Sequence, residues 1–126
     1  MLQLVVLCRA SAESTLNLIL VNIREFEYDL VAMEDEIKNL HNSKDVDPWV
    51  MGHDREELIK ILILQTDDLK TKIIALEKQK ADLQFLLKDV DWSTLHLFDV
   101  RLQFISNVIH GISKKVWALL EHEYDN

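Results

Sequence analysis

The apolar positions of the chain follow a helical repeat, which is clearest between Asp54 and Val90. This stretch of 37 residues contains neither Gly nor Pro. Apolar residues recur seven residues apart at Leu62, Leu69, Leu76, Leu83 and Val90. Three of these have an apolar residue three positions earlier, namely Ile59, Ile73 and Leu87, which gives the a/d spacing of a heptad. Such spacing is typical of a helix that packs on other helices. The sequence predicts a helix over 54–90, begun by a capping box in which Asp54 accepts from the backbone NH of Glu57.

A helix is predicted on each side of this one. The first, about 11–41, has apolar spacings of three and four from Leu16 to Leu40, and it starts at Ser11 or Ser14 or runs back to Leu2. The third, 93–124, has its own apolar series at Leu95, Phe98, Leu102, Ile105, Ile109, Ile112, Val116 and Leu119. Asp91 or Ser93 caps it, and Trp92 is expected to pack at the corner. Because no Gly or Pro separates 54–90 from 93–124, one continuous rod is the alternative.

Residues 43–53 form the linker between the first two helices. Asp47-Pro48 favours a single helical turn that Gly52 ends, and Trp49 is expected to cover one end of the bundle. We therefore expect a single domain, 1–126, with an all-α fold: an elongated antiparallel three-helix bundle or coiled coil that assembles as a dimer. In helix number, length and heptads it resembles spectrin-repeat-like and syntaxin-N-terminal-like bundles in outline, without a family motif.

Composition agrees with this fold class. The chain has 126 residues, of which two are Gly and one is Pro, and 48% are hydrophobic. A chain of this length buries a core without covalent cross-links. The scarcity of turn residues excludes most β architectures, which need them every 8 to 12 positions or so.

Charge limits the partners. The formal net charge is −8, from 22 acidic and 14 basic residues, which argues against nucleic acid because phosphate binding needs a concentrated basic surface. Acidic residues flank the seam of the first helix at Glu25, Glu27, Asp29, Glu34 and Glu36. Antiparallel packing predicts three groupings: Glu25 and Glu27 with Lys70 and Lys72, Asp67 and Asp68 with Lys114 and Lys115, and Asp82 with Arg101.

The N-terminus resembles a signal peptide only in part. Ala10-Ser11-Ala12 imitates a cleavage site after an apolar run, but no Lys or Arg precedes that run. No uninterrupted apolar stretch reaches about 18 to 20 residues, so we expect no direct membrane span. A single cysteine, Cys8, excludes an internal disulfide and favours an intracellular, cytoplasmic location.

Residues suited to chemistry are present without the spacing that chemistry needs. The histidines are His41, His53, His96, His110 and His122. No Glu lies three residues before any of them, and HExxH and Cys/His patterns are absent, so we expect no metal and no cofactor. Cys8 has no base nearby in the sequence, and the inward positions are apolar. These features argue against an enzyme.

The strongest functional signal is a surplus of apolar side chains beyond the seams. These residues are Ile61, Ile63, Leu64, Ile74, Phe85, Leu97, Val100, Phe104, Val108, Trp117 and Leu120. A three-helix bundle does not bury them all, and a contiguous exposed apolar patch marks a contact surface.

We therefore expect a protein–protein interaction or scaffold module that forms a homodimer or binds another helical protein. A bZIP-like DNA contact is excluded because the residues before Leu62 are not basic. The alternatives are a secreted or effector-type helical protein with a processed N-terminus that binds a host or partner protein, and a small-ligand-binding helical bundle.

Overall fold

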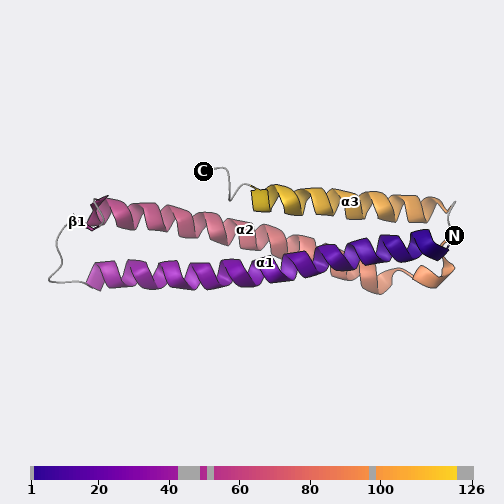
Figure 1. Cartoon of the computed structure of the whole chain (residues 1–126), viewed down its shortest axis with the longest axis horizontal. Coiled ribbons are helices and arrows are strands. Elements are labelled where there is room, and N and C mark those ends of the chain that lie inside the picture. The colour runs from indigo at the N-terminus through magenta and orange to yellow at the C-terminus, as the bar shows by residue number, and fades with distance from the viewer. Residues whose placement is uncertain (1, 43–48, 51–52, 97–98, 122–126) are drawn as a thin grey trace. The chain divides into compact units, whose positions relative to one another are not determined.

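The computed structural model describes residues 2–42, 49–50, 53–96 and 99–121, and it is an all-α helical bundle (Figure 1). Its helices are α1 (Leu2–Asn42), α2 (Arg55–Asp89) and α3 (Val100–Glu121), with a 3-10 turn, η1 (Trp92–Thr94), between α2 and α3. The predicted fold class is confirmed. The break between α2 and α3 excludes the continuous rod.

The observed helix ends can be compared with the predicted starts and caps. The first helix starts at Leu2, as in the alternative that runs back beyond Ser11. Asp54 caps α2, but its Oδ1 accepts from the backbone N of Glu56, at 3.2 Å, rather than from Glu57. The cap therefore lies where the sequence predicts it, with a bond one residue closer.

A short antiparallel strand pair replaces the helical turn expected after Asp47-Pro48. The strands are β1 (Trp49–Val50) and β2 (His53–Asp54), with Trp49 opposite Asp54 and Val50 opposite His53. Trp and Val favour extended backbone, which explains the difference. Asp47, Pro48, Met51 and Gly52, and the expected covering of the bundle end, lie outside the described residues.

The contacts within the chain group it into two compact units, and the expectation of a single domain over 1–126 stays a prediction. Unit 1 comprises residues 1–22 and 75–126, and unit 2 comprises residues 23–74. Unit 1 thus holds the first half of α1, the second half of α2 and all of α3. Unit 2 holds the remaining halves of α1 and α2.

In unit 1, three helices contribute to one core, with α2 and α3 antiparallel (Figure 1). Its buried apolar residues are Val5, Ala12, Ile19, Leu76, Leu83, Trp92, Leu95, Leu102, Ile105, Ile109, Ile112, Val116 and Leu120. The described residues of the predicted α3 series are buried up to Val116. The series then continues at Leu120, while Leu119 is half-buried, because a repeat of 3.6 residues calls for a step of four there.

In unit 2, α1 and α2 form an antiparallel pair (Figure 1). Leu40, Ile59 and Leu62 form a buried cluster there, with Ile37 and Leu58 packed against it. These are residues of the predicted seams or their direct neighbours. The pattern therefore identified the faces along which the two helices meet.

The predicted salt bridges of this pair are wrong in detail. Lys70 Nζ lies 3.9 Å from Glu34 Oε1, and Lys72 Nζ lies 3.2 Å from Asp68 Oδ2 on its own helix. Side chains of a helix lean toward its N-terminus. When two long side chains meet across an antiparallel helix pair, they therefore come from residues further C-terminal on each helix than the residues whose backbones face each other.

The corner between α2 and α3 is built by two aspartates. Asp91 caps η1, its Oδ1 accepting from the backbone N of Ser93 at 3.2 Å and from Ser93 Oγ at 2.6 Å. Trp92 is buried, and its Nε1 donates to the carbonyl of Leu87 at 3.4 Å, as expected for a corner residue. Asp99 caps α3, which begins at Val100 rather than at Ser93.

Candidate functional site

Most of the predicted interface residues reach the surface. Exposed side chains are Ile61, Ile63, Leu64 and Ile74 in unit 2 and Phe85, Val100, Phe104 and Trp117 in unit 1. Val108 is half-buried, and Leu97 lies outside the described residues. Leu120 is 7% exposed, so it belongs to the core and not to a contact surface.

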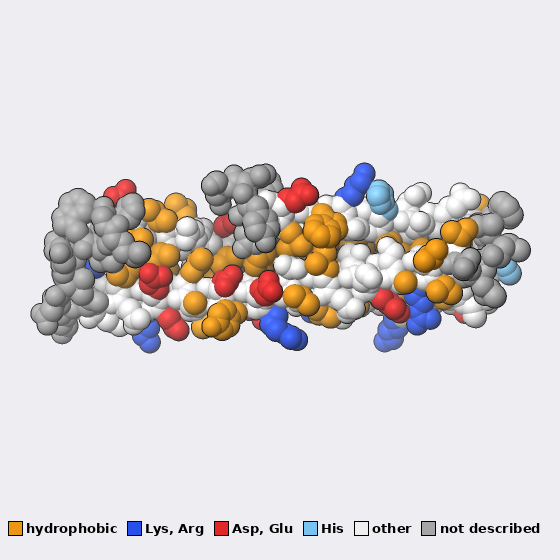
Figure 2. Space-filling view, in the orientation of Figure 1, with side chains coloured by type: hydrophobic (Ala, Val, Ile, Leu, Met, Phe, Trp, Pro, Cys, Tyr) orange, Lys and Arg blue, Asp and Glu red, His pale blue; other side chains and the backbone are white. Residues whose placement is uncertain are grey.

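Further exposed apolar residues lie on α1 and were not predicted. They are Leu4, Val6, Leu7, Leu20, Val21, Tyr28 and Val31. Figure 2 shows apolar side chains at several places on the visible face, among charged ones. For Leu4, Val6 and Leu7 the available signal is the apolar run before Cys8, which the sequence analysis interprets as a possible leader or as the start of the first helix.

Of the described helices, α1 is long and apolar enough to cross a membrane, judged by length and composition. The expectation of no direct membrane span rests on the lack of an uninterrupted apolar run and stays a prediction, because a core helix or a signal sequence has the same length and composition. Only 22% of the apolar 18-residue window of α1 is buried. The helix therefore presents a large apolar surface near the N-terminus.

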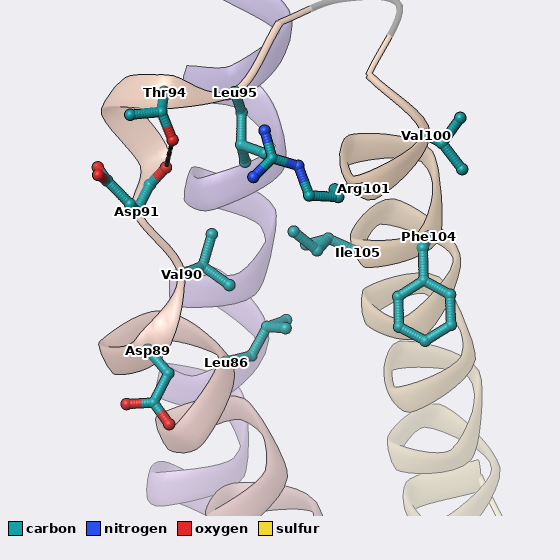
Figure 3. A pocket seen from close by; sticks show the side chains of 10 residues that line it. All are labelled: Leu86, Asp89, Val90, Asp91, Thr94, Leu95, Val100, Arg101, Phe104 and Ile105. Atoms are coloured by element: carbon teal, nitrogen blue, oxygen red, sulfur yellow. Dashed lines mark hydrogen bonds between the residues drawn. The ribbon is translucent and has the colours of Figure 1, made fainter.

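A pocket of about 660 Å³ lies at the corner of unit 1, and we call it the corner pocket. Its lining consists of Leu86, Asp89, Val90, Asp91, Thr94, Leu95, Val100, Arg101, Phe104 and Ile105. In Figure 3 Leu86 and Ile105 point toward each other from α2 and α3. The walls are largely aliphatic, which suits an apolar group.

The positively charged side chain at the corner pocket, Arg101, is paired with an aspartate. Arg101 Nη2 donates to Asp99 Oδ2 at 2.6 Å, and its Nε donates to Asp99 Oδ1 at 3.1 Å. The predicted pairing of Arg101 with Asp82 is therefore wrong. Hydrogen bonds from the Arg101 side chain and backbone lower the pKa of the Asp99 carboxyl group. Asp89 and Asp91 remain at the rim, so the pocket is apolar inside and acidic at its edge.

A second hollow of about 310 Å³ lies elsewhere between α2 and α3 in unit 1, and we call it the alanine hollow. It is lined by Ala75, Gln79, Lys115, Ala118 and Leu119. Gln79 is 7% exposed, and its buried Oε1 has no hydrogen-bond partner. A buried acceptor without a hydrogen-bond partner is costly, so the Gln79 side chain is an unfavourable feature of the packing beside this hollow.

Groups for catalysis or metal binding do not converge in the part of the chain that the structure describes. No set of three or more His, Cys, Asp or Glu side chains there is close enough to hold a metal ion. Burial raises the pKa of the Cys8 thiol, which disfavours the reactive thiolate.

The acidic flank lies on the surface of unit 2. All five of its residues are exposed: Glu25, Glu27, Asp29, Glu34 and Glu36. Glu34 of this flank pairs with Lys70 across the two helices. Asp68, which lies on α2, is predicted to face Lys114 and Lys115, but it pairs with Lys72 on its own helix.

The described residues form a helical bundle with exposed apolar side chains on all three helices. Comparison of the chain with protein-family models, curated proteins and solved structures gave no match. Its function is therefore argued from the surfaces alone.

Proposed function

We propose that this protein is a protein–protein interaction module that self-associates through apolar faces of α2 and α3. The observation that carries the proposal is the exposure of large apolar side chains there, such as Val100 at 77% and Phe104 at 67%. Where such side chains lie together in a contiguous patch of more than a few hundred Å², the patch commonly marks a contact surface.

The energetics support association. Full burial of one such side chain contributes about 1.5 to 3 kcal/mol. Association costs about 4 to 15 kcal/mol in lost freedom of motion, so a handful of side chains from each copy offsets it. The exposed acidic flank of α1 favours a basic surface when the partner is another helical protein.

Light scattering of the wild type and two double variants tests the proposal. Phe85→Asp with Phe104→Asp places charges on α2 and α3 and is expected to give monomers from a dimeric wild type. The matched control, Tyr28→Asp with Val31→Asp, changes two exposed residues of α1 and is expected to remain dimeric. A monomeric wild type, or loss of association only in the control, contradicts the proposal.

A second candidate is a secreted or effector-type protein whose N-terminus is processed. The exposed apolar surface of α1 near the N-terminus favours it, because a signal sequence has this character. Intact-mass measurement of the exported protein tests it. Loss of N-terminal residues supports processing, and retention of Met1 contradicts it.

A further inference from the structure

We propose that two copies of this chain pack antiparallel along α3 about a two-fold axis at Gly111, each inserting Phe104 into the alanine hollow of the other. The inference rests on the proposed self-association and adds the surface and its register. All of the residues involved belong to unit 1.

Gly111 is the first observation. Glycine inside a helix destabilises it by about 1 kcal/mol relative to alanine. A Cβ atom at this position would meet no atom within 4 Å, so packing within the described chain does not require glycine. A second helix crossing here does, because glycine permits the closest approach of two backbones.

The two hollows open on one side of the α2–α3 pair. On α3, Phe104, Gly111, Lys115 and Ala118 follow a spacing of seven, four and three residues, which places them on one helix face. The corner pocket lies at the start of this face and the alanine hollow near its end. The exposed Phe104 side chain therefore lies near one end of this face, and the alanine hollow lies near the other.

A two-fold axis at Gly111 matches these two ends. It sets Phe104 of one copy opposite Ala118 of the second, both about 10 Å from the axis along the helix. The exposed aromatic ring then fills a hollow lined by two alanines, and the contact repeats symmetrically.

The positions of charged residues favour the same alignment of the two copies about Gly111. Leu86 shares the corner pocket with Ile105, and Gln79 shares the alanine hollow with Lys115, so Asp82 lies about level with Gly111. Lys115 of the second copy, about 6 Å beyond the axis, then lies between Asp82 and Asp89. Both carboxylates are exposed. The axis thus brings a cation of each copy to two anions of the other.

A charge exchange tests the register by sedimentation velocity. Lys115→Glu alone, and Asp82→Lys with Asp89→Lys alone, are each expected to raise the dimer dissociation constant at least about tenfold, because like charges meet at two symmetric contacts. Mixing the two variants pairs opposite charges at both contacts. The mixture is expected to form heterodimers with close to wild-type affinity.

A second pair of variants tests the axis. Gly111→Leu is expected to abolish the dimer without weakening the fold, because the Cβ position is open and leucine favours helix. His110→Leu, at the neighbouring exposed position off this face, is the control and is expected to stay dimeric. Thermal unfolding of both variants shows whether the fold is kept.

The outcomes separate the two proposals. A wild type that is monomeric overturns self-association and this inference together. A dimeric wild type that tolerates Gly111→Leu, or whose charge variants do not recover on mixing, overturns this inference alone.

Discussion

Gln79 is unfavourably placed, because its buried Oε1 lacks a hydrogen-bond partner. Substitution with leucine removes the unsatisfied group and keeps a similar volume. Gln79→Leu is expected to raise the free energy of unfolding by about 1 to 3 kcal/mol. Urea unfolding at chain concentrations low enough for monomers measures this.

Gln84→Leu is the matched control for that substitution, because Gln84 is an exposed residue of the same helix. Its effect is expected to stay within about 0.5 kcal/mol. A loss of stability in Gln79→Leu would show that the Gln79 amide makes a stabilising bond.

Asp99 predicts a dependence of stability on pH. Hydrogen bonds from Arg101 hold its pKa below the ordinary value in the folded chain. The resulting stabilisation is present above the ordinary Asp pKa of about 3.9 and is lost as pH falls through the lower folded pKa. Asp99→Asn keeps a capping oxygen and removes the charge. Its melting temperature is expected to be below wild type at neutral pH and to converge with it in acid.

Asp35→Asn, an exposed residue of α1, controls for the loss of one carboxylate. It is expected to match wild type across the same pH series. An Asp99→Asn deficit that persists unchanged in acid would contradict a role for the Asp99 charge.

At the scale of the element, α2 shows how far a heptad pattern predicts packing. In unit 2 the predicted stripe is buried at Ile59, Leu62, Thr66 and Leu69. In unit 1 the buried stripe is Leu76, Gln79 and Leu83, while Lys80, on the predicted line, is half-buried. A helix of 3.6 residues per turn drifts by about 20° per heptad. The leucine line was therefore predictable, but the burial of Gln79 was not.

Leucines of α2 differ in importance accordingly. Leu83 is fully buried, so Leu83→Ala is expected to lower the free energy of unfolding by about 2 to 5 kcal/mol. Leu64 is exposed, so Leu64→Ala is expected to change it by less than about 0.5 kcal/mol. Urea unfolding of the two variants compares them directly, and equal effects would contradict the assigned core.

The start of α3 shows why a pattern can mislead. Leu95 fits the helical spacing of Leu102 and Ile105, yet it is buried from an extended residue after η1. Asp91 and Asp99 both have the chemistry of a helix cap, and Asp91 caps only the short turn. Periodicity alone does not separate a buried linker residue from a helical one.

At the scale of the whole molecule, the sequence predicted the fold class and an excess of apolar surface. It did not predict the exposed apolar residues of α1, because the apolar surplus beyond the seams was sought only in the second and third helices. It also placed Leu120 at the surface, since the seam was continued to Leu119. Both errors concern which side of a helix faces a neighbour, and only the packing of three helices decides that.

The exposed apolar faces of α2 and α3 are the basis of our central proposal, that this chain self-associates. Sedimentation equilibrium of the full wild-type chain over a wide concentration range tests it most directly. The account predicts an apparent mass that rises with concentration from one chain toward two. A mass of one chain at every concentration would contradict it.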